Sequence, residues 1–170
     1  MDLKYYIRTI PDFPKPGIQF RDITSLLRHP EAFRFTNDVF HQRYKDRSVD
    51  AVVGVESRGF IFGSVLSELL RCAFVPVRKE GKLPHVTFRQ EYTLEYGDTA
   101  IEIHDDALNR GDRVVIVDDL LATGGTLLAT SKLVEMLGAE IIECAVVIEL
   151  SGLQGRDRLG GYDVYSIVQY

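Results

Sequence analysis

The residues with the clearest chemical potential lie close together between 114 and 126 (VVIVDDLLATGGT). An apolar run ends in Asp118 and Asp119, and a Gly124-Gly125 pair then precedes a helical pattern. Glycines let the backbone approach an anion closely, free N–H groups at a helix start point toward it, and threonine hydroxyls add donors. Two carboxylates would repel a phosphate, but they suit a sugar diol and can orient the waters of a bound Mg²⁺. The run therefore predicts a site for a ribose phosphate.

A plainer interpretation is open for each part of this run. Asp118 and Asp119 could simply end a strand, and the two glycines could simply turn the chain. The run is neither a Walker A loop, because no Gly-Lys-Ser/Thr follows, nor a dinucleotide fingerprint, because Gly-x-Gly-x-x-Gly is absent. Only the whole stretch, taken together, favours the phosphate site.

A second polar group, residues 56–59 (ESRG), follows another apolar run and opens another helical pattern. Its N–H groups and the Arg58 guanidinium could meet a pyrophosphate. Arg78, Lys79 and Lys82 add positive charge further along the chain and could hold the same group. The alternatives are an ordinary turn with a surface arginine and a solvated basic patch.

The spacing of apolar residues predicts the strands and helices that carry these groups. Runs rich in Val and Ile predict strands at 50–55, 113–117, 141–149 and 163–168, with a brief strand at 74–77. Apolar residues three and four apart predict helices at 59–71 and 124–137, the second capped by Gly138. Strand, turn, helix and strand follow one another twice, which indicates an open α/β fold with a mainly parallel sheet and helices on both faces. Ligands of such sheets bind beyond the carboxyl ends of the strands.

The remaining segments are expected to belong to the same single domain, residues 1–170. Residues 78–98 combine charge, Gly, Pro and aromatic side chains, which favours a long mobile hairpin or lid. A merely solvated hairpin is the alternative. Residues 1–30 are rich in Pro and are expected to form a small N-terminal cap.

Composition narrows the class of protein. The 170 residues carry a formal net charge of −5, so no domain-wide positive field would attract nucleic acid. No apolar stretch approaches the roughly 20 residues that span a bilayer, and no membrane association is expected. Cys72 and Cys144 lie in apolar runs and are expected to be reduced thiols, which indicates the cytoplasm. The histidines lack metal-ligand spacing and are expected at the surface, without a zinc site: His29, His41, His85 and His104.

Residues 114–126 resemble the phosphoribosyl pyrophosphate motif of the type I phosphoribosyltransferases. Other segments resemble the adenine-specific members of that family and cover most of the chain. These are the base-recognition segment at 16–24 (PGIQFRDIT), the pyrophosphate loop at 53–60 (VGVESRGF), and the mobile catalytic loop at 78–84 (RKEGKLP) with 94–97 (LEYG). The resemblance implies the type I phosphoribosyltransferase fold. It also implies that the phosphoribosyl group of phosphoribosyl pyrophosphate is transferred to adenine, which yields AMP and pyrophosphate, as in purine salvage. It also implies Mg²⁺ as the cofactor and a homodimer.

The resemblance further implies roles for individual residues. Catalysis is expected of Arg58, Glu95, Asp118 and Asp119. Phosphate is expected to bind Ala122, Thr123, Gly124, Gly125 and Thr126, and pyrophosphate to bind Glu56, Ser57, Arg58, Arg78, Lys79 and Lys82. Adenine is expected to contact Gln19, Phe20, Arg21, Leu120 and Tyr96, with Phe20 as a stacking face. Mg²⁺ would be held mainly by substrate and water near Asp118 and Asp119, without a dedicated protein cage. Gln19 departs from the family, in which a small or apolar side chain is expected.

Two other functions are open at this point. A phosphoribosyltransferase for hypoxanthine, guanine, xanthine or a pyrimidine would use the same phosphate motif, and only the N-terminal segment and the lid argue for adenine. A non-catalytic regulator that senses phosphoribosyl pyrophosphate would need a DNA-reading module. No basic helix-turn-helix segment is evident, so an enzyme is favoured.

Overall fold

The computed structural model describes residues 1–94 and 97–170, and the chain folds as two compact units, Met1–Val39 and Phe40–Tyr170. The first unit contains the 3₁₀ turn η1 (Leu3–Tyr6), strands β1 (Arg8–Pro11) and β2 (Gln19–Asp22), and the short helix α1 (Thr24–Leu27). β1 and β2 form a two-stranded antiparallel sheet. Helix α2 (Pro30–Tyr44) begins in this unit and ends in the next.

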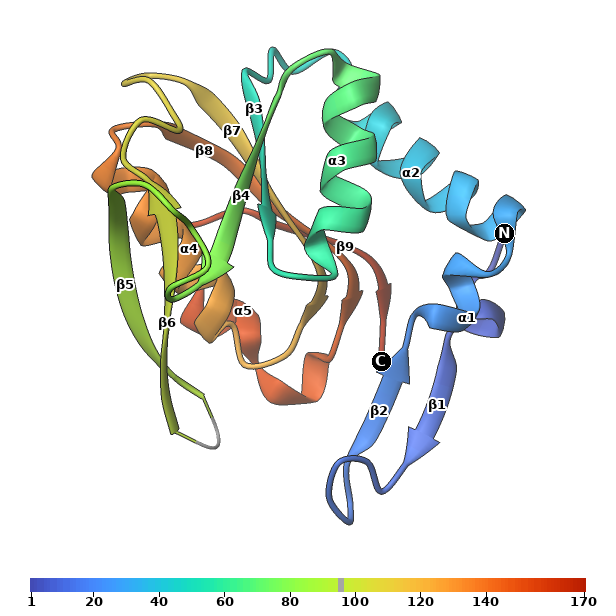
Figure 1. Ribbon diagram of the computed structural model, residues 1–170. Helices are drawn as coiled ribbons and strands as arrows, with labels where there is room; N and C mark the ends of the chain where they lie inside the picture. Colours follow the sequence, from blue (N-terminus) through green and yellow to red (C-terminus); the bar gives the residue numbers. More distant parts are fainter. Residues whose placement is uncertain (95–96) are drawn as a thin grey trace. The chain divides into compact units, whose positions relative to one another are not determined.

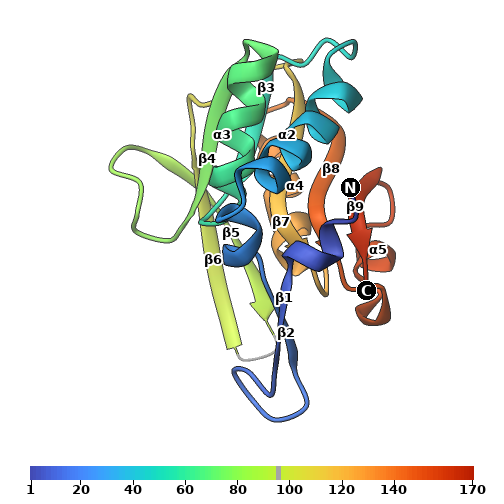
Figure 2. The same ribbon diagram turned by 90° about the vertical axis from the view of Figure 1, so that its right-hand side faces the viewer.

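Among the described residues, the second unit is built around a seven-stranded sheet in the order β5-β6-β4-β3-β7-β8-β9 (Figures 1 and 2). The strands are β3 (Ala51–Val55), β4 (Ala73–Lys79), β5 (Thr87–Leu94), β6 (Gly97–His104), β7 (Arg113–Leu121), β8 (Glu140–Glu149) and β9 (Val164–Gln169). Strands β4, β3, β7, β8 and β9 are parallel, and the β5–β6 hairpin joins β4 in the antiparallel direction. The predicted mainly parallel sheet is confirmed.

Helices α3 (Gly59–Leu70) and α4 (Gly125–Met136) cover opposite faces of this sheet (Figure 1). Val53 of β3 packs in one core cluster with Leu127 of α4. On the other face, Gly63 of α3 lies against Gly54 and Phe74, with so little space that a Cβ on Gly63 would come within 3.0 Å of the Phe74 ring. The two βαβ units and the helices on both faces are therefore as predicted.

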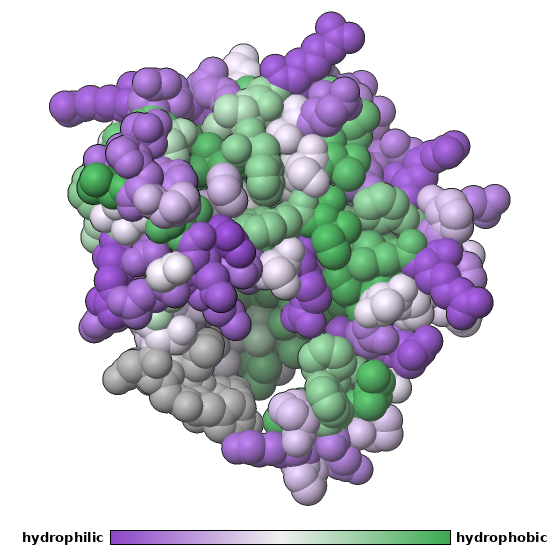
Figure 3. Space-filling model, in the orientation of Figure 1, coloured by the Kyte–Doolittle hydropathy of each residue, from purple (hydrophilic) through white to green (hydrophobic). Residues whose placement is uncertain are grey.

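The outer side of α3 keeps an apolar character. Ile61 and Val65 are half-buried and Leu69 is 38% exposed, and these residues follow one another at four-residue intervals along one helix face. Apolar surface gathers over α3 in the space-filling view (Figure 3). The face of α3 that points away from the sheet could therefore make further apolar contacts.

The predicted elements of the second unit are all present, and one end differs in an important way. β7 extends to Leu121, so Asp118 and Asp119 lie inside a strand and not after it. The cause is pairing with the neighbouring strand, because β8 continues alongside and places Glu149 opposite Leu121. Gly138 follows α4 with a φ of 79°, as expected of a residue that ends a helix.

Helix α2 had no counterpart in the sequence prediction. Polar residues interrupt its apolar positions, although Pro30 at its first position is a common start signal. The segment expected to be a lid, 78–98, divides into parts: Arg78 and Lys79 complete β4, residues 80–86 form a loop, and β5 then begins. None of the described helices has the length and apolar character to cross a membrane.

Candidate active site

A cavity of about 430 Å³ lies where the parallel strands β3, β4 and β7 end. Its walls are residues 56–58 after β3, Lys79 at the end of β4, Tyr92 of β5, and residues 118–127, which run from β7 into α4. The volume suits a small-molecule ligand. The position agrees with the expectation that ligands of open α/β sheets bind beyond the strand ends.

Two acids form the floor of this cavity. Asp119 is 3% exposed, and its backbone N–H donates to Asp118 Oδ1 at 2.8 Å. Burial, and then repulsion from Asp119, raise the pKa of Asp118 well above its ordinary value. Burial also raises the pKa of Asp119. The two carboxyl groups are therefore held together at an energetic cost that a cation or hydroxyl donors from a ligand would relieve.

Arg58 supplies positive charge next to these acids. Its Nε lies 2.7 Å from Asp119 Oδ2, and the guanidinium opposes the burial-driven rise in the Asp119 pKa. The same Asp119 oxygen is shielded from solvent. Gly59 lets the first turn of α3 pack closely against β7, because a Cβ there would lie 2.5 Å from the carbonyl oxygen of Val117.

The loop between β7 and α4 also lines the cavity. Gly124 has a φ of 81°, a conformation that favours glycine, and directly precedes the first residue of α4. Intrahelical bonding begins with the Leu128 N–H donating to the Gly124 carbonyl at 2.9 Å. The N–H groups of the first turn have no intrahelical acceptor and face the helix start, which suits an anion. Ala122, Thr123 and Thr126 also line the cavity.

Glu56 joins the loop after β3 to the end of β4. Its carboxylate accepts hydrogen bonds from Arg78 Nε at 3.3 Å, Arg78 Nη2 at 3.2 Å and the Lys79 N–H at 2.8 Å. Burial favours protonation, but these bonds and the Arg78 charge outweigh it and lower the pKa of Glu56. Glu56 is thus ionised and connects the loop after β3 to the end of β4. The peptide bond between Glu56 and Ser57 is cis.

The expected pyrophosphate residues are consequently divided. Ser57, Arg58 and Lys79 line the cavity together with Glu56. The Arg78 guanidinium is instead occupied by Glu56 and by the Lys82 carbonyl, to which Nη1 donates at 3.1 Å. Lys82 is exposed in the 80–86 loop, and neither Arg78 nor Lys82 belongs to the described cavity lining.

The expected adenine residues lie in different parts of the chain. Gln19, Phe20 and Arg21 form β2 of the N-terminal unit, and Leu120 lines the cavity of the second unit. The Phe20 ring packs edge-on against Phe13, with centroids 5.2 Å apart. Glu95 and Tyr96 lie outside the described residues.

Some residues that line the cavity were not predicted from the sequence. Tyr92 lines the cavity from β5, and only its place in an alternating, aromatic segment could have indicated this. Leu121 and Leu127 also line it, although they read as ordinary core residues in the sequence.

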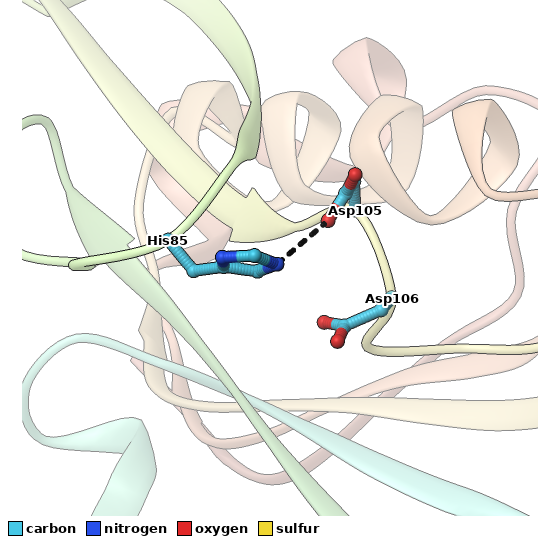
Figure 4. Close-up of side chains that lie close together, drawn as sticks. All are labelled: His85, Asp105 and Asp106. Carbon is cyan, nitrogen blue, oxygen red and sulfur yellow. Dashed lines mark ion pairs between the residues drawn. The ribbon is translucent and has the colours of Figure 1, made fainter.

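A separate polar cluster lies away from the cavity lining. His85, Asp105 and Asp106 are exposed, and their ligand atoms lie within 4.8 Å of one another (Figure 4). His85 Nε2 is 3.9 Å from Asp105 Oδ1. The spacing of histidines in the sequence could not show this cluster, since tertiary folding brings the 80–86 loop beside the turn after β6. All three side chains are solvated, and we assign them no role.

His29 is exposed as expected, whereas His41 and His104 are half-buried.

Residues 22–168 match the family model of the phosphoribosyl transferase domain. The chain is 55% identical to the adenine phosphoribosyltransferase of Roseiflexus castenholzii, over 100% of this chain and 99% of that protein. The solved structure of the enzyme from Thermoanaerobacter pseudethanolicus is similar with a TM-score of 0.96 and 48% identity, covering 99% of this chain and 98% of that one. The Saccharomyces cerevisiae enzyme, solved with adenine and an imino-altritol bisphosphate, is similar with a TM-score of 0.93 and 40% identity, covering 98% and 97%.

The fold is therefore that of a phosphoribosyltransferase. Within that class, the chain belongs to the adenine phosphoribosyltransferase family.

Proposed function

We propose that the protein transfers the phosphoribosyl group of phosphoribosyl pyrophosphate to adenine, releasing pyrophosphate and forming AMP for purine salvage. One observation carries the proposal: a single cavity brings together the acids Asp118 and Asp119, the glycine-rich start of α4, and the cations Arg58 and Lys79. A phosphate, a sugar diol and a leaving pyrophosphate each find a matching group in such a cavity.

The phosphate of the substrate would bind at the start of α4. Gly124 and Gly125 let the backbone come close, and the N–H groups of the first helical turn point toward the anion. Hydroxyls of Thr123 and Thr126 add donors, and the small side chain of Ala122 leaves room. No charged side chain is needed for this part of the site, which agrees with the composition of the loop.

Asp118 and Asp119 would hold the ribose hydroxyls and stabilise the positive charge that develops on the sugar ring as pyrophosphate leaves. A carboxylate aimed at developing positive charge lowers the barrier more than it stabilises the ground state. The raised pKa values support this role, because negative charge that burial disfavours in the free enzyme is compensated when a cationic transition state forms.

Pyrophosphate would leave toward the turn after β3. Ser57, Arg58 and Lys79 offer donors from the cavity wall, and Glu56 contributes by fixing Arg78 and the end of β4. Arg78 and Lys82 add positive charge beside this wall. Glu95, which the family places over the reacting base, would handle the proton at adenine.

The cavity residues also fit the Mg²⁺ that the family uses. Two adjoining carboxyl groups with raised pKa values form an oxygen-rich environment that a hard cation prefers. When bound near Asp118 and Asp119, mainly through substrate and water, Mg²⁺ would supply positive charge to the pyrophosphate.

The residues that would bind adenine are Phe20, as a stacking face, with Leu120 and Tyr96. The backbone of Gln19 and Arg21 would read the edge of the base. Adenine offers a donor beside an acceptor, and an extended strand presents a carbonyl and an N–H that match this pair. The yeast relative solved with adenine supports this choice of base.

We also propose a cytoplasmic homodimer. The outward apolar face of α3, formed by Ile61, Val65 and Leu69, supports a contact between two copies (Figure 3). The two unpaired thiols, Cys72 and Cys144, support a reducing compartment.

The deciding experiment mixes the protein with Mg²⁺, phosphoribosyl pyrophosphate and each nucleobase separately, and identifies the nucleotide by mass. AMP should form from adenine, and little product should form from hypoxanthine, guanine, xanthine or a pyrimidine. The Asp118→Asn variant is the control for chemistry in this cavity. Preferential turnover of another base, or none of any base, would refute the proposal.

A further inference from the structure

The loop between β7 and α4 rests on a second turn of the chain. That turn comprises η2 (Ser151–Leu153) and the start of α5 (Gly155–Arg158). A Cβ on Gly124 would come within 2.6 Å of the Gly155 carbonyl oxygen, and a Cβ on Gly155 would come within 2.3 Å of the Ala122 carbonyl oxygen. Contacts this close leave no slack between the two backbones. A shift of Gly155 must therefore move the loop that carries Ala122 and Gly124.

An ion pair between the exposed Arg156 and the buried Glu149 holds this second turn in place. Arg156 Nε donates to Glu149 Oε1 at 2.7 Å, and Nη2 donates to Oε2 at 2.8 Å. Glu149 is 5% exposed and also accepts from Ser166 Oγ at 2.6 Å. The remaining guanidinium nitrogen, Nη1, donates to the Val164 carbonyl at 2.8 Å. A planar fork bound on two sides fixes the direction as well as the distance of the turn, which an ammonium group could not do.

The turn needs such an anchor, because its backbone is unfavourable by itself. Gln154, immediately before Gly155, has φ 53° and ψ 33°, in the left-handed region that costs energy for a residue with a side chain. Such conformations persist when the surroundings over-determine them. Arg156 lies two residues further along the chain and supplies that constraint.

We propose that Glu149 and Arg156 are positioning residues that set the phosphate-binding loop through Gly155. The proposal rests on the function given above, in which this loop binds the phosphate of phosphoribosyl pyrophosphate. Neither residue belongs to the described cavity lining, so the pair acts on the ligand through the loop. Loss of the fork should weaken phosphate binding while Asp118 and Asp119 keep their places on β7.

The chain offers a matched control on the same strand. Glu143 of β8 is 4% exposed and accepts a fork from Arg43, with Nε at 2.5 Å and Nη2 at 2.6 Å. This pair ties the end of α2 to the sheet and makes no contact with the phosphate loop in the described residues. Arg43→Lys and Arg156→Lys therefore remove the same kind of fork from the same strand, and only Arg156→Lys should affect phosphate binding.

The test measures kcat, the KM for phosphoribosyl pyrophosphate and for adenine, and the Kd of ribose 5-phosphate by calorimetry. Arg156→Lys should raise the KM for phosphoribosyl pyrophosphate and the Kd of ribose 5-phosphate about ten-fold, since small displacements of a positioning group cost this much or more. The value of kcat and the KM for adenine should change much less. Arg43→Lys should lower the thermal midpoint without raising either phosphate constant. Glu149→Gln, which removes the charge from the other partner, should reproduce the effect of Arg156→Lys.

Two results would overturn the inference: an unchanged Kd of ribose 5-phosphate in Arg156→Lys and Glu149→Gln, or an equal loss in Arg43→Lys. Failure of the proposed function is separately visible. A parent protein that binds ribose 5-phosphate but does not turn over adenine refutes the activity, and the calorimetric comparison still decides the positioning role.

Discussion

Arg58 and Asp119 form an ion pair at the border between the protein interior and the cavity, with Nε 2.7 Å from Oδ2. The Asp119 side chain is 4% exposed, whereas that of Arg58 is 43% exposed. The acid is therefore fixed, and the cation has solvent on its outer side. An arrangement of this kind lets one guanidinium stabilise a buried carboxylate and meet an incoming anion.

Replacing Arg58 should change the pH dependence of the reaction. Arg58 opposes the rise in the Asp119 pKa, so Arg58→Gln should raise that pKa further. If ionised Asp119 is the active form, the acid limb of the kcat/KM profile should move to higher pH, and the KM for phosphoribosyl pyrophosphate should rise. Arg34→Gln, at an exposed position of α2, is the control and should leave the profile in place. An acid limb that does not move in Arg58→Gln would show that Asp119 ionisation does not limit activity.

Asp118→Asn should separate stability from activity. Because burial raises the folded-state pKa of Asp118 above its ordinary value, the ionised group destabilises the fold, and this effect grows as pH rises above that ordinary value. Removing the charge should raise stability at neutral pH by about 1 kcal/mol, with little gain in acid, and lower kcat about a hundred-fold. Thermal melts at the two pH values and steady-state rates measure both effects.

Asp119→Asn should likewise remain folded and lose turnover, although its loss of the Arg58 pair offsets any gain in stability. If both asparagine variants turn over adenine like the parent, the ribose and metal roles assigned to this pair are wrong.

The segment 80–96 should respond to ligand. Lys82 is exposed in the loop between β4 and β5, so trypsin should cut there in the free enzyme. Mg²⁺ with phosphoribosyl pyrophosphate should slow this cut, because closure over the substrate is expected of the lid. A time course with mass analysis of the fragments, and a Lys82→Gln control, identifies the bond. Equal cleavage rates with and without ligand would count against the lid.

Base selectivity should survive Gln19→Ala. The Gln19 side chain is exposed and Phe20 is half-buried against Phe13, so the backbone of β2 is the better reader of the base edge. Hypoxanthine or guanine would leave two groups unpaired at about 1–3 kcal/mol each, which predicts selectivity of about two to four orders of magnitude. Phe20→Ala should weaken all bases together. Competition assays decide between the accounts, and a Gln19→Ala enzyme that accepts hypoxanthine would place selectivity in the side chain.

The parts of the site that the sequence predicts are local in the chain. Asp118, Asp119 and the two glycines lie within one strand, turn and helix, and periodicity is enough to align them. The extension of β7 past its acids depends on β8, a strand that begins after the intervening helix. Pairing of that kind is set by the sheet as a whole and leaves no mark in the local pattern.

The sequence also does not reveal interactions between residues that are far apart in the chain. Glu56 and Arg78 are 22 residues apart, and each looked like a pyrophosphate ligand when considered alone. Their ion pair is visible only once β3 and β4 are side by side. Gly155 shows the same limit. A Cβ at this position would clash with the carbonyl oxygen of Ala122 on another loop, and the local sequence does not reveal that contact.

The short ladder between β4 and β6 has a consequence for how this chain can vary. Within the part of the chain that the structure describes, only Arg78 with Glu102 and Lys79 with Ile101 are paired there, at one side of the parallel strands that hold the acid pair. Insertions or deletions in the β5–β6 hairpin therefore need not alter the register of those strands. Exchanging that hairpin would change the cavity wall at Tyr92 without shifting those strands, whereas adding one residue between Asp119 and Gly124 would misplace every donor of the helix start.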